Sequence, residues 1–163
     1  MYLGKWKLND YLTFTCNTHS PTTGSVSAAS GAVSYSIYED ETGTAIISGS
    51  MSSLGASTGF YSERIQLTSV SGFENGKTYT VRIQATVEGV TAALIHTFQT
   101  DLIIEGTISE TQALKVLLAA LAGRSSGGGT TSITFRDTAN SINRIVATVD
   151  SNGNRTNVTL NGD

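Results

Sequence analysis

The strongest constraint on the fold of this chain is the strict alternation of apolar and polar residues in "TYTVRIQATV" at positions 78–87. Side chains at every second position of a β-strand share one face, so the residues from Tyr79 to Val87 present an apolar face to a core. Glu88 and Gly89 then form a two-residue hairpin turn. Pairing across this turn places Phe98 opposite Tyr79, and the second strand has its own apolar face in the same phase. We therefore predict a β-hairpin that is packed on one side.

The rest of the N-terminal part has the composition and spacing of an all-β domain. The chain of 163 residues contains 17 Gly, a single Pro and 14% charged residues, with abundant Ser and Thr. Strand-like segments bounded by Gly, Ser or Asp/Asn clusters are predicted at 11–17, 33–39, 44–50, 60–68, 78–87 and 90–100. Short strands at this spacing predict a mainly β protein with a β-sandwich over residues 1–101.

The segment "FENGKTYTVRIQATVEG" is similar to the penultimate strand of immunoglobulin-like and fibronectin type III domains. In those domains a tyrosine at the position of Tyr79 closes a corner by hydrogen bonding back to the chain. The resemblance implies an immunoglobulin-like β-sandwich over residues 1–101. The chain lacks the cysteine pair and the intersheet tryptophan of antibody domains, so the resemblance implies no particular ligand.

Residues 102–163 have a different pattern and are predicted to form a second domain. The sequence "SETQALKVLLAALAG" indicates a helix, because Ser109 and Gln112 match a capping box and Gly123 is suited to a C-terminal stop. Four leucines form the apolar stripe of this helix: Leu114, Leu117, Leu118 and Leu121. Alanines and Val116 cover most of the remaining surface, so we expect the helix to be buried on nearly all sides.

The C-terminal sequence "RIVATVDSNGNRTNVTL" predicts a second hairpin, with a type I′ turn at Asn152-Gly153. In that register Asp150 faces Arg155, and Val149 faces Thr156. One face of the hairpin is apolar and contains Ile145, Ala147, Val149, Val158 and Leu160. With a preceding strand at 132–136, the hairpin makes an antiparallel three-stranded β-meander. The glycine-rich residues 124–131 are predicted to be a flexible joint.

We expect the apolar face of this meander to pack on the leucine stripe. One helix and three strands make a core close to the lower size limit for independent stability. We therefore expect other copies of the chain to complete it, and we predict a homotrimer. The predicted oligomer interface comprises Leu114, Leu117, Leu118, Leu121, Ile133, Phe135, Ile145, Val158 and Leu160.

Residues that would support catalysis or metal binding are few. Cys16, the only cysteine, is interpreted as a small buried hydrophobe. His96 falls on the inward face of its strand and is interpreted as a core histidine with satisfied hydrogen bonds, far in sequence from His19. The acidic residues 39–41 precede a turn and are interpreted as a solvated loop tip. We therefore expect no enzymatic activity, no cofactor and no metal site.

Charge and hydropathy argue against further classes of partner. The net charge is −3 and the Lys and Arg residues are scattered, so we expect no nucleic-acid binding. The sequence has no run of about 18 apolar residues and no signal peptide at its N-terminus. We therefore expect a protein that is neither inserted in a membrane nor exported.

The sequence from "ALKVLLAALAG" through "TFRD" to "RIVATVDSNGNRT" resembles a C-terminal module of tailed-bacteriophage structural proteins. The shared pattern is an apolar helix, a glycine-rich joint, a Phe-Arg-Asp strand, an Asn/Asp loop and a strand closed by Asn-Gly-Asn-Arg-Thr. The chain departs from it at Ile142 and Asn143, where such modules have Asp or Lys. The resemblance covers residues 113–160. It implies a virion protein, assembled in the host cytoplasm, whose partners are other head, neck or tail proteins.

Three functions stay open at this point. The first is an oligomeric fibre, spike or appendage on the neck, tail or head of the virion, and the second is a capsid decoration protein. The third, from another class, is an adhesin module that binds host-surface glycans, for which the aromatic candidates are Tyr2, Trp6, Phe60 and Tyr61. We expect residues 102–163 to mediate assembly and residues 1–101 to be displayed.

Overall fold

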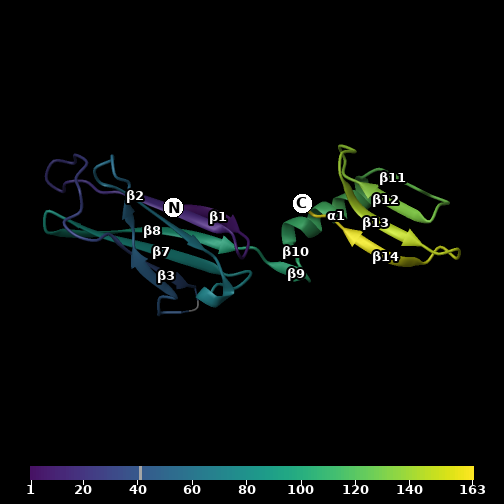
Figure 1. Ribbon diagram of the computed structural model, residues 1–163, viewed down its shortest axis with the longest axis horizontal. Coiled ribbons are helices and arrows are strands. Elements are labelled where there is room, and N and C mark those ends of the chain that lie inside the picture. The colour runs from purple at the N-terminus through teal and green to yellow at the C-terminus, as the bar shows by residue number, and fades with distance from the viewer. Residues whose placement is uncertain (41) are drawn as a thin grey trace. The chain divides into compact units, whose positions relative to one another are not determined.

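The computed structural model describes residues 1–40 and 42–163 (Figure 1). The protein is mainly β, and α1 (Glu110–Ala122) is the one α-helix among the described residues. The chain divides into two compact units, Met1–Asp101 and Leu102–Asp163, which we call unit 1 and unit 2.

Unit 1 contains two β-sheets. The five-stranded sheet has the order β1-β8-β7-β3-β4, and the three-stranded sheet has the order β2-β6-β5. Neighbouring strands are antiparallel except for β1 and β8, which run parallel (Figure 1). The strands are β1 (Tyr2–Trp6), β2 (Tyr11–Asn17), β3 (Ser34–Glu39), β4 (Ile47–Ser50), β5 (Ser52–Ser53), β6 (Phe60–Gln66), β7 (Thr78–Val87) and β8 (Val90–Thr100).

Both sheets contribute to one hydrophobic core. Along β2, every second side chain is buried, which places Leu12, Phe14 and Cys16 in the interior. The ring of Phe14 meets the ring of Tyr35 on β3 edge to face, with 5.1 Å between their centroids. Cys16 is therefore a buried hydrophobe, as predicted.

The β7–β8 hairpin has the predicted register. Glu88 and Gly89 have φ of 50° and 79°, the two positive values that a type I′ turn requires. Phe98 pairs with Tyr79, and His96 pairs with Val81. The Tyr79 hydroxyl accepts a hydrogen bond from the backbone of a preceding residue, as the corner in the resemblance implies.

The sequence pattern did not predict β1 or β5. β1 contains Gly4 at a φ of 99°, and its pairing with β8 shifts register between Tyr2 and Lys5. This irregularity hides the alternation from which strands are predicted. β5 is only two residues long, Ser52 and Ser53, and both are polar.

Unit 2 begins with a small hairpin and continues into the helix. Ser109 and Gln112 form the predicted capping box at the start of α1: each side chain bonds the backbone N–H of the other residue. The helix ends before Gly123, as predicted, but Gly123 has extended backbone angles instead of a left-handed conformation. It is glycine for a different reason, because a Cβ there would lie 1.9 Å from the carbonyl oxygen of Arg136.

The sheet of unit 2 has four strands in the order β11-β12-β13-β14, so the prediction of three strands is wrong by one. The additional strand lies in the glycine-rich segment that was predicted to be a flexible joint: Ser125 and Ser126 pair with Phe135 and Thr134. Because both residues of this strand are serines, it has no alternation of apolar and polar residues from which a strand could be predicted. The strands of unit 2 are β9 (Ile103–Glu105), β10 (Ile108–Ser109), β11 (Ser125–Ser126), β12 (Ser132–Arg136), β13 (Asn143–Val149) and β14 (Arg155–Leu160).

The β13–β14 hairpin has the predicted register over most of its length but a different turn. Ile145 pairs with Leu160 and Ala147 pairs with Val158, as predicted. Near the turn the register shifts, so that Val149 pairs with Arg155; the predicted pairs of Val149 with Thr156 and of Asp150 with Arg155 are wrong. The cause is the Asp150 carboxylate, which accepts the backbone N–H groups of Asn152 and Asn154 and closes a wider turn.

The helix contacts β12 and β13. Ala119 of α1 and Ala147 of β13 are both almost fully buried, whereas the four leucines of the stripe are exposed. The prediction that the sheet packs on the leucine stripe is therefore wrong. Alanines and Gly123 allow a closer approach of helix and sheet than leucines do, and the bulky stripe is left on another side of the helix.

Candidate functional site

The most exposed apolar surface of unit 2 is the leucine stripe of α1, formed by Leu114, Leu117, Leu118 and Leu121. Their side chains are 60%, 53%, 54% and 78% exposed. Large exposed apolar patches on a folded domain mark interaction sites, whereas isolated exposed leucines do not. These four residues recur at helical spacing on one side of a single helix, so they form a continuous surface.

An apolar groove of ≈ 260 Å³ adjoins this stripe. Leu117 of the stripe forms part of its wall together with Leu160 of β14, so the structure brings together two of the predicted interface residues that are distant in sequence. The complete lining is Ile104, Ile108, Ala113, Val116, Leu117, Ala120 and Leu160.

The remaining predicted interface residues lie on the sheet. Val158 and Leu160 are exposed on β14, whereas Ile133, Phe135 and Ile145 are only partly accessible. The last three lie on the same face of the sheet as the buried Ala147, because Ile133 pairs with Ala147 and Phe135 pairs with Ile145. They therefore contribute to the small core of unit 2 and offer less surface to a partner than the stripe.

Two residues of the groove were missed by the sequence reasoning. Ile104 lies in β9 and Ile108 lies in β10, and Ile104 is 58% exposed. The signal was present in the apolar run "LIIEGTI", which leads into the helix.

The polar residues Asp137 and Arg144 of unit 2 have structural roles. The Asp137 carboxylate accepts the backbone N–H groups of Ser141 and Ile142 and the hydroxyl of Ser141. These bonds, that of the Ser141 hydroxyl foremost, lower the pKa of Asp137. Arg144 is buried and donates to the carbonyl oxygens of Asn161 and Asp163. Both side chains therefore close loops and hold the end of β14.

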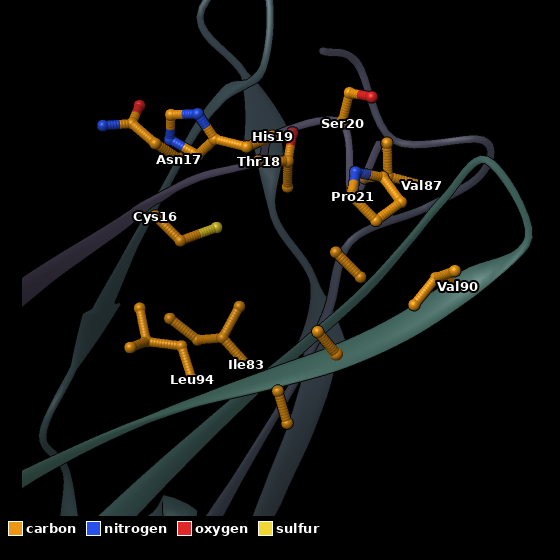
Figure 2. Close-up of a pocket in the computed structure, with 13 residues that line it drawn as sticks. Cys16, Asn17, Thr18, His19, Ser20, Pro21, Ile83, Val87, Val90 and Leu94 are labelled. Carbon is orange, nitrogen blue, oxygen red and sulfur yellow. The ribbon is translucent and has the colours of Figure 1, made fainter. Parts of the chain in front are cut away.

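An open pocket of ≈ 390 Å³ lies in unit 1, between the end of β2 and the β7–β8 hairpin (Figure 2). Figure 2 shows Cys16, Ile83 and Leu94 around the hollow, with Pro21 and Val87 also facing it. Burial raises the pKa of the Cys16 thiol, so it is protonated at neutral pH and is not an activated nucleophile. His19 also lines the pocket, and its Nδ1 lies 3.2 Å from the carbonyl oxygen of Gly24.

His96 lies in the interior of unit 1, as predicted, and is 3% exposed. The prediction that its hydrogen bonds are satisfied is wrong, because neither ring nitrogen makes a hydrogen bond of normal geometry among the described residues, although the backbone of Thr15 interacts with the ring enough to raise its pKa. Burial lowers the pKa of His96, which keeps the imidazole neutral at pH 7.

The structure also places most of the acidic and aromatic residues that the sequence singled out. Glu39 pairs with Lys77 at 3.5 Å, whereas Glu41 of the predicted loop tip lies outside the described residues. Two of the four aromatic candidates for glycan binding are committed to internal contacts. Trp6 Nε1 donates to the carbonyl of Leu3, and Tyr61 is buried. Phe60 is partly buried, and Tyr2 is exposed.

In residues 1–40 and 42–163, no three His, Cys, Asp or Glu side chains are grouped so that they could hold a metal ion. Within the same residues, no helix has the length and apolar character needed to cross a membrane. No protein-family model, curated protein or solved structure matches the chain.

Proposed function

We propose that the protein is a non-enzymatic structural component of a tailed-phage virion, an oligomeric fibre, spike or appendage attached to the neck, tail or head. The exposed leucine stripe is the observation that carries this proposal. An exposed row of four leucines on a stable helix is costly in water unless another surface covers it. Unit 2, whose sequence resembles a phage module, is in this proposal the assembly element.

The partner of the stripe in this proposal is the same stripe in other copies. Numbered as a heptad from Leu114, the leucines occupy positions a, d, e and a. This surface is wider than the a/d seam that suits a pair of helices. A wider stripe allows each helix to contact two neighbours around an axis, which supports a trimer. Leu160 and the groove beside Leu117 extend the contact onto β14.

Unit 1 in this proposal is an immunoglobulin-like β-sandwich that is displayed on the particle. Its two sheets around one core and the corner hydrogen bond of Tyr79 support this assignment. Its interior is well filled, since Leu12, Ile37 and Phe98 are fully buried. Because these apolar side chains are buried in the core of unit 1 itself, its loops are available for contacts with other molecules.

Localisation in the particle tests the proposal. A tag on the full-length protein, labelled with gold in purified virions, should lie at the neck, tail or head. Labelling on the whole capsid surface would assign the capsid decoration role, whereas absence of the protein from purified particles would refute the proposal. Particles that lack the protein should then rebind the wild-type chain but not a Leu117→Asp variant if assembly of unit 2 is required.

A further inference from the structure

One edge of β8 is unpaired over the first half of the strand. On that edge β1 pairs with β8 only from Thr97 onward. The Met1 amino group donates to Ile95 O at 2.9 Å, and Thr97 N–H donates to Met1 O at 2.8 Å. Backbone groups that point to the same edge recur at every second residue, so those of Thr91 and Ala93 also point there. In the part of the chain that the structure describes, no strand pairs with them on this edge.

The unpaired segment, residues 90–95, has the sequence "VTAALI". All six residues are exposed, including Val90, Leu94 and Ile95. It contains no charge and no proline, and its pairing with β7 has no bulge. Folded proteins normally protect such an edge with lysine, proline, a bulge or a covering segment. This segment has none of these protections and is therefore suited to pairing with another strand.

We infer that residues 90–94 pair antiparallel with the same residues of a second copy, around a two-fold axis at Ala92. In this register Thr91 of each copy lies opposite Ala93 of the other, and each such pair exchanges two backbone hydrogen bonds. The register uses the unpaired groups and leaves the existing bond between Met1 and Ile95 in place. The two five-stranded sheets thereby become one continuous sheet.

A second copy fits this edge because the segment is complementary to itself. Ala92 lies opposite Ala92 of the second copy at a non-hydrogen-bonded position, where the two Cα atoms are only about 4.5 Å apart and small side chains are favoured. Val90 lies opposite Leu94 of the second copy. Both of these residues also line the open pocket of unit 1 in Figure 2, so each copy extends the apolar surface around the pocket of the other. No like charges oppose one another.

This contact is isologous and lies within unit 1, so it does not depend on the leucine stripe of unit 2. It is tested in the full-length chain carrying Leu117→Asp and Leu118→Asp, which remove the association proposed for unit 2. Sedimentation velocity over a series of concentrations should show a monomer–dimer equilibrium for this parent. Adding Ala92→Lys or Ala92→Glu should each weaken the dimer at least about tenfold, because like charges then face each other at the axis.

An equimolar mixture of the Ala92→Lys and Ala92→Glu chains should restore the dimer, since opposite charges then meet. Ala56→Lys, at an exposed position in a loop of unit 1, is the matched control and should leave the dimer unchanged. Circular dichroism checks that each variant is folded. A parent that is monomeric at every concentration overturns the inference, as does a dimer that is insensitive to both Ala92 variants. A mixture that associates no better than its components also overturns it.

Discussion

The hydroxyl of Tyr79 accepts a hydrogen bond from the backbone N–H of Glu74, with 2.8 Å between oxygen and nitrogen. The Tyr79 ring is fully buried, edge to face with Phe73 and stacked with Phe98. The hydrogen bond ties the loop before β7 to the centre of the core. A backbone N–H near a buried ring has little access to water, so this contact is costly to lose.

We expect Tyr79→Phe to lower the free energy of unfolding of unit 1 by about 1–2 kcal/mol, because the N–H of Glu74 loses its partner while the ring packing is retained. Chemical denaturation followed by tyrosine and tryptophan fluorescence measures this change. Tyr38→Phe is the control, since the partly buried Tyr38 has no hydroxyl hydrogen bond among the described residues. Equal effects of the two substitutions would contradict the role of the Tyr79 hydroxyl.

Gly127→Ala should destabilise unit 2, whereas Gly128→Ala should have little effect. Gly127 has a φ of 86°, and a Cβ there would lie 2.0 Å from the carbonyl oxygen of Ser132; around Gly128 the space is open. We expect a loss of about 1–3 kcal/mol for Gly127→Ala. Thermal unfolding by circular dichroism compares the two variants. A flexible joint, as the sequence alone predicted, would tolerate both equally.

The stability of unit 1 should fall as the pH falls below about 6.5, the pKa of an unperturbed histidine. Burial lowers the pKa of His96; the backbone of Thr15 offsets part of this, and the Met1 amino group lowers it further. The unfolded chain therefore takes up a proton at a higher pH than the folded chain does. Stability is full above the unfolded pKa and is lost as the pH falls toward the lower, folded pKa.

Thermal unfolding between about pH 7 and pH 5 measures this effect. His96→Leu should reduce the pH dependence in that range. His19→Leu, which replaces an exposed histidine, should leave it unchanged. A pH dependence that is the same in the wild type and in His96→Leu would show that His96 is not its source.

The β7–β8 hairpin and its register could be predicted because apolar and polar residues alternate strictly and a short turn connects the two strands. Alternation from Tyr79 onward and the turn at Glu88-Gly89 are local features, and together they leave one pairing. The β1–β8 pairing has no such signal, because Tyr2 and Thr97 are distant in sequence and no turn connects them. Parallel pairing of distant strands is decided by the core that both strands cover.

The residues of the leucine stripe were predicted, but the side of the helix that faces the sheet was not. The sequence from Leu114 to Leu121 is apolar on nearly all sides, so the pattern alone does not say which side meets the sheet. Close packing decides this in favour of the side with the buried Ala119, and the lack of a side chain at Gly123 admits the backbone of β12 at Arg136. At the second hairpin, Asn152-Gly153 predicted a type I′ turn, but hydrogen bonds to the Asp150 carboxylate favour a wider one. The packing side of the helix and the type of this turn both depend on contacts in three dimensions, which the sequence pattern does not show.

The oligomeric state of the full-length chain, measured by sedimentation equilibrium, tests most directly whether the leucine stripe mediates self-association. In a chain carrying Ala92→Lys, which removes the pairing inferred for unit 1, we predict a trimer when the stripe is intact and a monomer for Leu117→Asp, because burying an unpaired carboxylate in an apolar contact costs several kcal/mol. Val70→Asp is the matched control, since Val70 is an apolar residue of unit 1 that is 97% exposed, and it should leave the trimer intact. A wild-type chain that remains a folded monomer, or an assembly that is unchanged by Leu117→Asp, would contradict the account.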